Sequence, residues 1–186
     1  MISNLPDRIF LCGFMGAGKS TIGKKIAERL ELTFLDLDDY IEHEAGKNIP
    51  EIFEEGGEQA FRKAERKCIL EVVRTFEGVV ALGGGSLQNQ HMVDHIKLNG
   101  LLVFIETPIS VILERINEDT NRPLLLNKDG TVKEKEMLEK ELSALYDKRL
   151  PLYRQAELTV TDDGEKNIET LVDNLMNKIK YHVSHY

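Results

Sequence analysis

RIFLCGFMGAGKST, residues 8–21, joins an apolar run of strand length to a glycine-rich loop. Residues 13–20 match the pattern G-x-x-x-x-G-K-[S/T] at every fixed position. The apolar residues Ile22, Ile26 and Leu30 then recur every fourth position, which predicts an amphipathic helix. A strand, this loop and a helix in succession are the context in which the pattern marks a phosphate-binding loop, the P-loop. The alternative is a glycine-rich turn that only connects a strand to a helix.

The residue types of this loop suit an anion. Glycines let successive backbone N–H groups turn inward, and the start of the helix adds a partial positive charge. Lys19 would reach the β- and γ-phosphates of a nucleotide, and the Ser20 hydroxyl would ligate Mg²⁺. We therefore expect the nucleotide to lie in a cradle formed by Gly13, Gly16, Ala17, Gly18, Lys19, Ser20 and Thr21.

The rest of the chain alternates apolar runs of strand length with amphipathic stretches. Strands are expected at 8–12, 33–37, 79–82, 101–106 and 157–161, and helical faces recur from 58 to 76 and from 168 to 179. Short, continuous apolar runs are typical of strands buried on both faces of a parallel sheet. No linker or repeat divides the 186 residues. The sequence predicts one domain, a three-layer α/β/α sandwich with a parallel sheet of five strands, and ligands at the carboxyl ends of those strands.

FLDLDD, residues 34–39, places carboxylates at the end of the second predicted strand. Side chains alternate along a strand, so Asp36 and Asp38 would face the same side. Paired carboxylates near a P-loop can hold Mg²⁺ and accept a hydrogen bond from a substrate hydroxyl. Alternatively, one of these residues caps the following helix, and Asp39 is the expected cap.

Two further motifs follow at the same expected edge of the sheet. Arg62 and Glu65 lie three residues apart on a predicted helix, so an ion pair could hold the Arg62 guanidinium for a carboxylate substrate. An exposed helical arginine is otherwise simply solvated. Gly83, Gly84 and Gly85 end an apolar strand, and without side chains they would let a ligand approach the backbone closely; the alternative is a flexible loop entry.

Basic residues recur in the second half of the chain. Arg115 lies on the predicted helix after Pro108, and Arg122 lies in a polar stretch at about 117–133. That composition is typical of a lid that closes over phosphates, or of a long surface loop. Arg149 lies near the end of a helix that Pro151 is expected to terminate, where it could bind a substrate or cap the helix.

Composition narrows the function classes. There are 32 acidic and 24 basic residues, a formal charge of −8, which argues against general nucleic-acid binding. No apolar stretch reaches the length of a membrane span, so no membrane partner is expected. Cys12 and Cys68 lie far apart at apolar positions, which indicates reduced thiols in the core and favours the cytoplasm.

Together these motifs resemble the shikimate kinase family. The matching segments are GFMGAGKST at 13–21, FLDLDD at 34–39, FRKAE at 61–65, LGGG at 82–85, NRPLL at 121–125 and RLPLY at 149–153. Many nucleoside triphosphatases share the P-loop, but this combination of motifs is much narrower. The resemblance implies a P-loop fold like that of the nucleoside monophosphate kinases. It also implies the phosphorylation of the 3-hydroxyl of shikimate by Mg-ATP, a step of the chorismate pathway to aromatic amino acids.

The resemblance also implies roles for individual residues. Asp38 would hold the shikimate hydroxyls, Arg62 and Arg149 its carboxylate, and the Gly83–Gly85 backbone would contact the substrate. Ser20 and Asp36 would position Mg²⁺. Lys19 and Arg122 would stabilise the transferring phosphoryl group, and Arg115 and Arg122 would flank the adenine. The family further suggests a monomer, with a substrate-binding segment at about 36–62 and a lid at about 117–133.

Two other functions compete with this interpretation. One is a related small-molecule kinase, such as a gluconate kinase, because gluconate is also a polyhydroxy carboxylate. The other is a non-catalytic nucleotide-binding protein of the same fold. Such a protein would be expected to lose catalytic or substrate-binding groups, whereas this chain keeps Lys19, Asp36, Asp38, Arg62 and Arg149.

Overall fold

The computed structural model describes residues 5–116 and 134–185. Within these residues the strands are β1 (Arg8–Cys12), β2 (Phe34–Asp36), β3 (Gly78–Ala81), β4 (Leu101–Glu106) and β5 (Leu158–Thr161). The helices of the described residues are α1 (Lys19–Leu30), α2 (Leu37–Ala45), α3 (Ile49–Thr75), α4 (Gln90–Leu98), α5 (Ile109–Ile116), α6 (Lys135–Tyr153) and α7 (Ile168–His185). Strands and helices therefore alternate through most of the chain, as the sequence pattern predicts.

The five strands form one sheet in the order β2-β3-β1-β4-β5, and every pairing is parallel. β1 lies at the centre, with Phe10 opposite Val80 on one side and Leu102 on the other. The predicted parallel sheet is confirmed, and β1 and β4 have the predicted bounds. Almost every residue of these two strands is buried, so the apolar runs in the sequence coincide with the strands of the structure.

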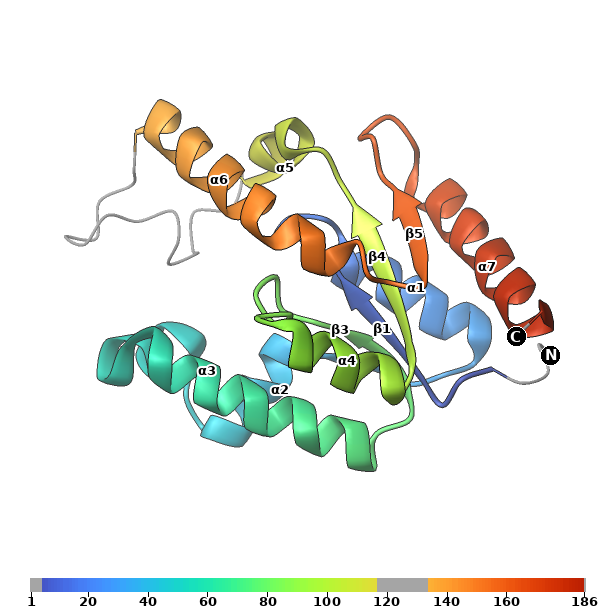
Figure 1. Ribbon diagram of the computed structural model, residues 1–186, viewed down its shortest axis with the longest axis horizontal. Helices are drawn as coiled ribbons and strands as arrows, with labels where there is room; N and C mark the ends of the chain where they lie inside the picture. Colours follow the sequence, from blue (N-terminus) through green and yellow to red (C-terminus); the bar gives the residue numbers. More distant parts are fainter. Residues whose placement is uncertain (1–4, 117–133, 186) are drawn as a thin grey trace.

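Helices cover both faces of the sheet (Figure 1). Ile9 and Leu11 of β1 pack into a cluster with α1 and α7, whereas Phe10 and Cys12 pack into a cluster with the helices α2 to α6. The alternation of these four side chains follows from the two-residue period of a strand. The three-layer sandwich predicted from the sequence is thereby confirmed.

Two helices differ from their expected forms. α3 begins at Ile49 and bends at Gly57, where φ is 65° and ψ is −168°, and it carries Arg62 on the part after the bend. α6 continues through Pro151 to Tyr153, so the prediction that it ends at the proline is wrong. Proline lacks an N–H, but the last turn still closes because the N–H of Arg154 donates to the carbonyl of Leu150 at 3.0 Å. Arg149 and Tyr153 therefore share one helix.

No helix formed by residues 5–116 or 134–185 combines the length and the apolar character that a membrane crossing needs.

Gly13 sets where the P-loop leaves the sheet. Its φ is +146°, and a Cβ at this position would lie 2.6 Å from the backbone oxygen of Ile105 in β4. Only a residue without a side chain can bring the chain this close to the neighbouring strand. The P-loop therefore begins in tight contact with β4.

We expect Gly13→Ala to lower the free energy of unfolding more than Gly46→Ala does. Gly46 also has a positive φ, +64°, but a Cβ there would meet nothing within 4 Å. Gly46→Ala should therefore cost only the left-handed conformation, about 1–2 kcal/mol. Gly13→Ala should add a steric cost of about 1–3 kcal/mol, measured by urea unfolding of both variants. Equal losses would contradict the close approach to β4.

Candidate active site

Two pockets lie side by side at the carboxyl edge of the sheet. The first, of about 510 Å³, is lined by the P-loop together with Asp36 and Arg115, and the second, of about 490 Å³, by Arg62, Glu65 and Arg149. Both pockets are also lined by Met15, Asp38, Gly83 and Gly84. Because the two pockets share these residues, a molecule bound in one pocket would lie next to a molecule bound in the other. This arrangement suits the transfer of a chemical group between the two molecules.

The P-loop folds around its own lysine. The Lys19 ammonium donates to the carbonyls of Gly13 at 3.1 Å and Phe14 at 2.9 Å, and the side chain is largely buried. α1 begins directly after Gly18, so its first N–H groups open toward the pocket. A helix N-terminus and a held ammonium at one pocket wall favour an anionic ligand.

Asp36 joins the second strand to the P-loop. Its Oδ2 accepts from the Ser20 hydroxyl at 2.5 Å, and its Oδ1 accepts from the backbone N–H of Asp38 at 3.0 Å. Asp36 is therefore the cap of α2, and the prediction that Asp39 caps this helix is wrong. The cap must be the last extended residue, and Asp39 already lies within the first helical turn.

Asp38 also lies on α2 and not on the strand, so the expected strand alternation of Asp36 and Asp38 is wrong as well. The two residues still line the same pocket. A Cβ on Gly83 would lie 2.8 Å from Oδ1 of Asp38, so this carboxylate packs against the glycine loop, residues 83–85. Asp38 thereby stands where the two pockets meet.

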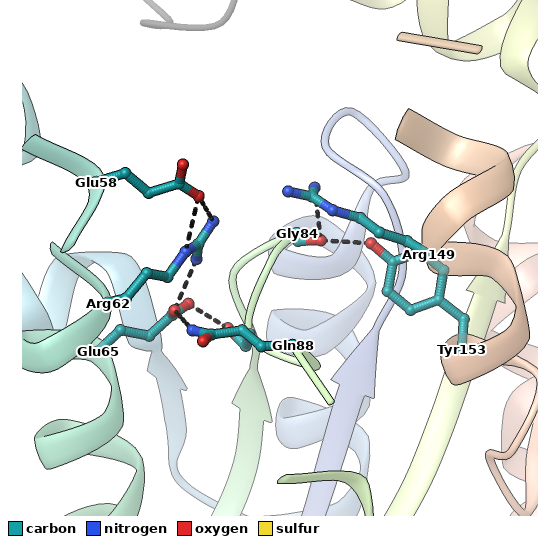
Figure 2. Close-up of polar contacts among 8 residues, drawn as sticks. Glu58, Arg62, Glu65, Gly84, Gln88, Arg149 and Tyr153 are labelled. Carbon is teal, nitrogen blue, oxygen red and sulfur yellow. Dashed lines mark hydrogen bonds and ion pairs between the residues drawn. The ribbon is translucent and has the colours of Figure 1, made fainter. Parts of the chain in front are cut away.

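Arg62 is held by a buried carboxylate, as Figure 2 shows. Glu65 has no solvent exposure, and its oxygens accept from Arg62 Nη1 at 2.7 Å, from the Ser86 hydroxyl at 2.7 Å and from Gln88 Nε2 at 2.9 Å. The predicted ion pair is confirmed. Glu58 adds a longer, exposed contact to Arg62 Nε at 3.3 Å. These three donors offset the cost of burying the charge of Glu65. The Glu65 carboxylate, held in place in this way, fixes the position of the Arg62 guanidinium.

The glycine loop fits between this arginine and a second one. A Cβ on Gly85 would lie 2.5 Å from Nη2 of Arg62, so the guanidinium lies directly against the loop backbone. On the other side, Arg149 Nη1 donates to the Gly84 carbonyl at 3.0 Å, and its guanidinium lies 5.6 Å from the centre of the Phe14 ring. Figure 2 shows Gly84 between the two arginines.

Arg115 reaches the P-loop from α5. Its Nη1 donates to the Gly16 carbonyl at 3.3 Å and pairs with Asp162 at 2.8 Å. Asp162 directly follows β5 and is nearly fully buried. Arg122 and the predicted lid at about 117–133 lie outside the described residues.

Sequence reasoning missed five residues that support the candidate site. Glu58 and Asp162 pair with Arg62 and Arg115, Ser86 and Gln88 donate to Glu65, and Tyr153 donates to the Gly84 carbonyl. Two signals were available: Asp162 follows a strand at the carboxyl edge, and Tyr153 lies four residues beyond Arg149 on one helix. Nothing in the local sequence pairs Ser86 or Gln88 with Glu65.

The candidate metal site is sparse in protein ligands. Within the described residues, no three His, Cys, Asp or Glu side chains are grouped to hold a metal. Ser20 and Asp36 offer two adjacent oxygens beside the P-loop. This donor set fits Mg²⁺, which keeps several waters and takes further oxygens from substrate phosphates.

Comparison with known proteins agrees with this geometry. The family model described as shikimate kinase matches residues 15–180. The chain belongs to the shikimate kinase family. A shikimate kinase of Chlorobaculum parvum is 39% identical over 94% of this chain and 93% of its own, and one of Chlorobium phaeobacteroides is 41% identical over 96% and 89%.

Solved structures give the same result for the fold. A shikimate kinase from Acinetobacter baumannii in complex with shikimate superposes with a TM-score of 0.86 at 35% identity, covering 97% of this chain and 96% of its own. A gluconokinase from Sinorhizobium meliloti superposes with a TM-score of 0.56 at 18% identity, over 97% of this chain and 95% of its own. The gluconokinase likeness shows the fold alone.

We expect Glu65→Gln to destabilise this shikimate kinase family member far more than Glu58→Gln. Both glutamates contact Arg62, but Glu65 is buried whereas the Glu58 side chain is 71% exposed. An amide at position 65 loses charge and turns a donor toward other donors, which should cost about 1–3 kcal/mol. The exposed pair should contribute less than about 1 kcal/mol. Urea unfolding of both variants measures the difference, and equal values would refute the anchoring role of Glu65.

Proposed function

We propose that this protein transfers the γ-phosphoryl group of ATP, bound with Mg²⁺, to the 3-hydroxyl of shikimate. The products are shikimate 3-phosphate and ADP, in the pathway to chorismate and the aromatic amino acids. The observation that carries the proposal is the pair of adjoining pockets, one with a P-loop and one with two arginines, that share Asp38. Membership of the shikimate kinase family supports the choice of substrate.

The phosphate side of the reaction depends on positioning and charge. The nucleotide phosphates would lie along the backbone N–H groups at the start of α1, and Lys19 would turn from the loop carbonyls to the β- and γ-phosphates. Ser20 and Asp36 would hold Mg²⁺, which neutralises charge on the phosphates when bound. Arg115 would lie beside the adenine.

The acceptor side matches the chemistry of shikimate, a small carboxylate with three hydroxyls. Arg62 and Arg149 would bind the carboxylate, because both guanidiniums are held in place and line the same pocket. The backbone of Gly83–Gly85 would contact the ring. Asp38 would orient the 3-hydroxyl and accept its proton as the oxygen attacks the γ-phosphorus.

The proposal also covers parts of the chain assigned by resemblance. The segment at about 36–62 would bind the substrate. Arg122, with the lid at about 117–133, would cover the nucleotide and stabilise the transferring phosphoryl group, although these residues lie outside the described part of the chain. We place the activity in the cytoplasm, in line with the buried, free thiols of Cys12 and Cys68.

Release of ADP by the purified protein tests the proposed function. With Mg-ATP, we expect strong release with shikimate and little with gluconate or without an acceptor. Slow release unaffected by either acid would overturn the substrate assignment, and strong release with gluconate alone would favour a gluconate kinase.

Lys19→Ala should abolish the shikimate-dependent release of ADP with little loss of stability, because the Lys19 ammonium would stabilise the transferring phosphoryl group. Near-normal turnover of Lys19→Ala would contradict the phosphate cradle.

We expect Arg62→Ala to weaken shikimate binding far more than ATP binding. Loss of a desolvated partner of the carboxylate should cost about 2–4 kcal/mol, read as a rise in the KM for shikimate. Arg66→Ala is the matched control, because Arg66 lies on the same helix but is exposed. Equal weakening of both substrates by Arg62→Ala would refute the role of Arg62.

A further inference from the structure

The carbonyl of Gly84 accepts two hydrogen bonds from one helix. The donors are Arg149 Nη1, at 3.0 Å, and the hydroxyl of Tyr153, four residues further along α6. Residues four apart lie on the same face of a helix, so both donors reach the same acceptor (Figure 2). A carbonyl oxygen has two lone pairs, and here each has its own donor.

Tyr153 is built into the core and is not a mobile surface residue. The side chain is 1% exposed, and its ring stacks on Phe104 of β4 with ring centres 5.3 Å apart. Burial raises the pKa of the Tyr153 hydroxyl well above its usual range. The hydroxyl therefore remains protonated and acts as a fixed donor to Gly84.

The orientation of the next peptide group follows from this contact. The carbonyl of Gly84 and the N–H of Gly85 belong to one planar trans unit and point in opposite directions. Because the carbonyl faces α6, the N–H of Gly85 points away from α6. The Arg62 guanidinium lies against the Cα of Gly85, where a Cβ would be 2.5 Å from its Nη2. Both glycines line the second pocket, here called the acceptor pocket, together with Arg62 and Arg149.

Three successive glycines cannot fix this orientation themselves, because glycine populates many backbone conformations. We propose that Tyr153 is a positioning residue of the acceptor site. Its hydroxyl fixes the Gly84–Gly85 peptide, so that the Gly85 N–H donates to the carboxylate of the acceptor while Arg149 remains aimed at the same group. This inference rests on the proposed function and adds to it a residue that does not touch the substrate.

Tyr153→Phe tests the role by removing one oxygen atom and keeping the ring. The KM for shikimate should rise between about threefold and tenfold, the value of one hydrogen bond, while the KM for ATP changes by less than about twofold. Tyr146→Phe is the control for loss of a hydroxyl on the same helix. Its ring packs edge-on against Phe14, and both KM values should stay unchanged.

A second variant separates positioning from stability. Phe104→Leu loosens the packing of the Tyr153 ring but leaves the hydroxyl in place, so it should lower the melting temperature without changing the ratio of the two KM values. Unchanged KM values for Tyr153→Phe would overturn the positioning role. So would a rise of both KM values in parallel, or the same change of ratio in Phe104→Leu. Absence of shikimate-dependent ADP release from the unmutated protein would instead overturn the proposed function itself.

Discussion

Parallel pairing of β1 with β3 and β4 determines where every candidate functional group lies. Parallel strands all end at the same edge, so the segments that follow them converge there. The P-loop follows β1, Asp36 ends β2, the glycine loop follows β3 and Asp162 follows β5. Helices then add the arginines from both directions, α3 from one side of the glycine loop and α6 from the other. A single reversed strand would move its segment to the opposite edge of the sheet.

The candidate site is held in shape before any ligand binds. Arg62 is fixed by the buried Glu65, Arg149 by the Gly84 carbonyl and the Phe14 ring, and Lys19 by two carbonyls of the P-loop. Ordering a long cationic side chain during binding costs conformational entropy. Because these contacts already order the side chains in the folded protein, less entropy is lost when a ligand binds. The acceptor pocket thus presents two oriented guanidiniums on either side of a backbone without side chains, an arrangement suited to a planar carboxylate.

Sequence patterns predicted the elements well where the local and the tertiary requirements coincide. β4 is a buried apolar run between Gly100 and Thr107, so its bounds could be read directly. β2 is shorter than expected because Asp36 turns its side chain to the α2 backbone, a choice among three neighbouring aspartates that periodicity does not make. The contacts of Glu65 with Ser86 and Gln88 span more than twenty residues. Such pairings depend on how α3 packs beside the end of β3, and no spacing along the chain encodes that.

The two pockets are also physically joined through the glycine loop. A Cβ on Gly84 would lie 3.0 Å from the backbone nitrogen of Met15, so the loop after β3 packs directly on the P-loop. Phe14, also in the P-loop, lies beneath the guanidinium of Arg149 on the acceptor side. The backbone that surrounds the phosphates is therefore in contact with the groups that orient the acceptor. Because closely packed interiors transmit small shifts, a displacement of the P-loop backbone also displaces Gly84 and Arg149. A side chain at position 84 would push these two loops apart by a few tenths of an ångström, and the pockets on either side of them would shift with the loops.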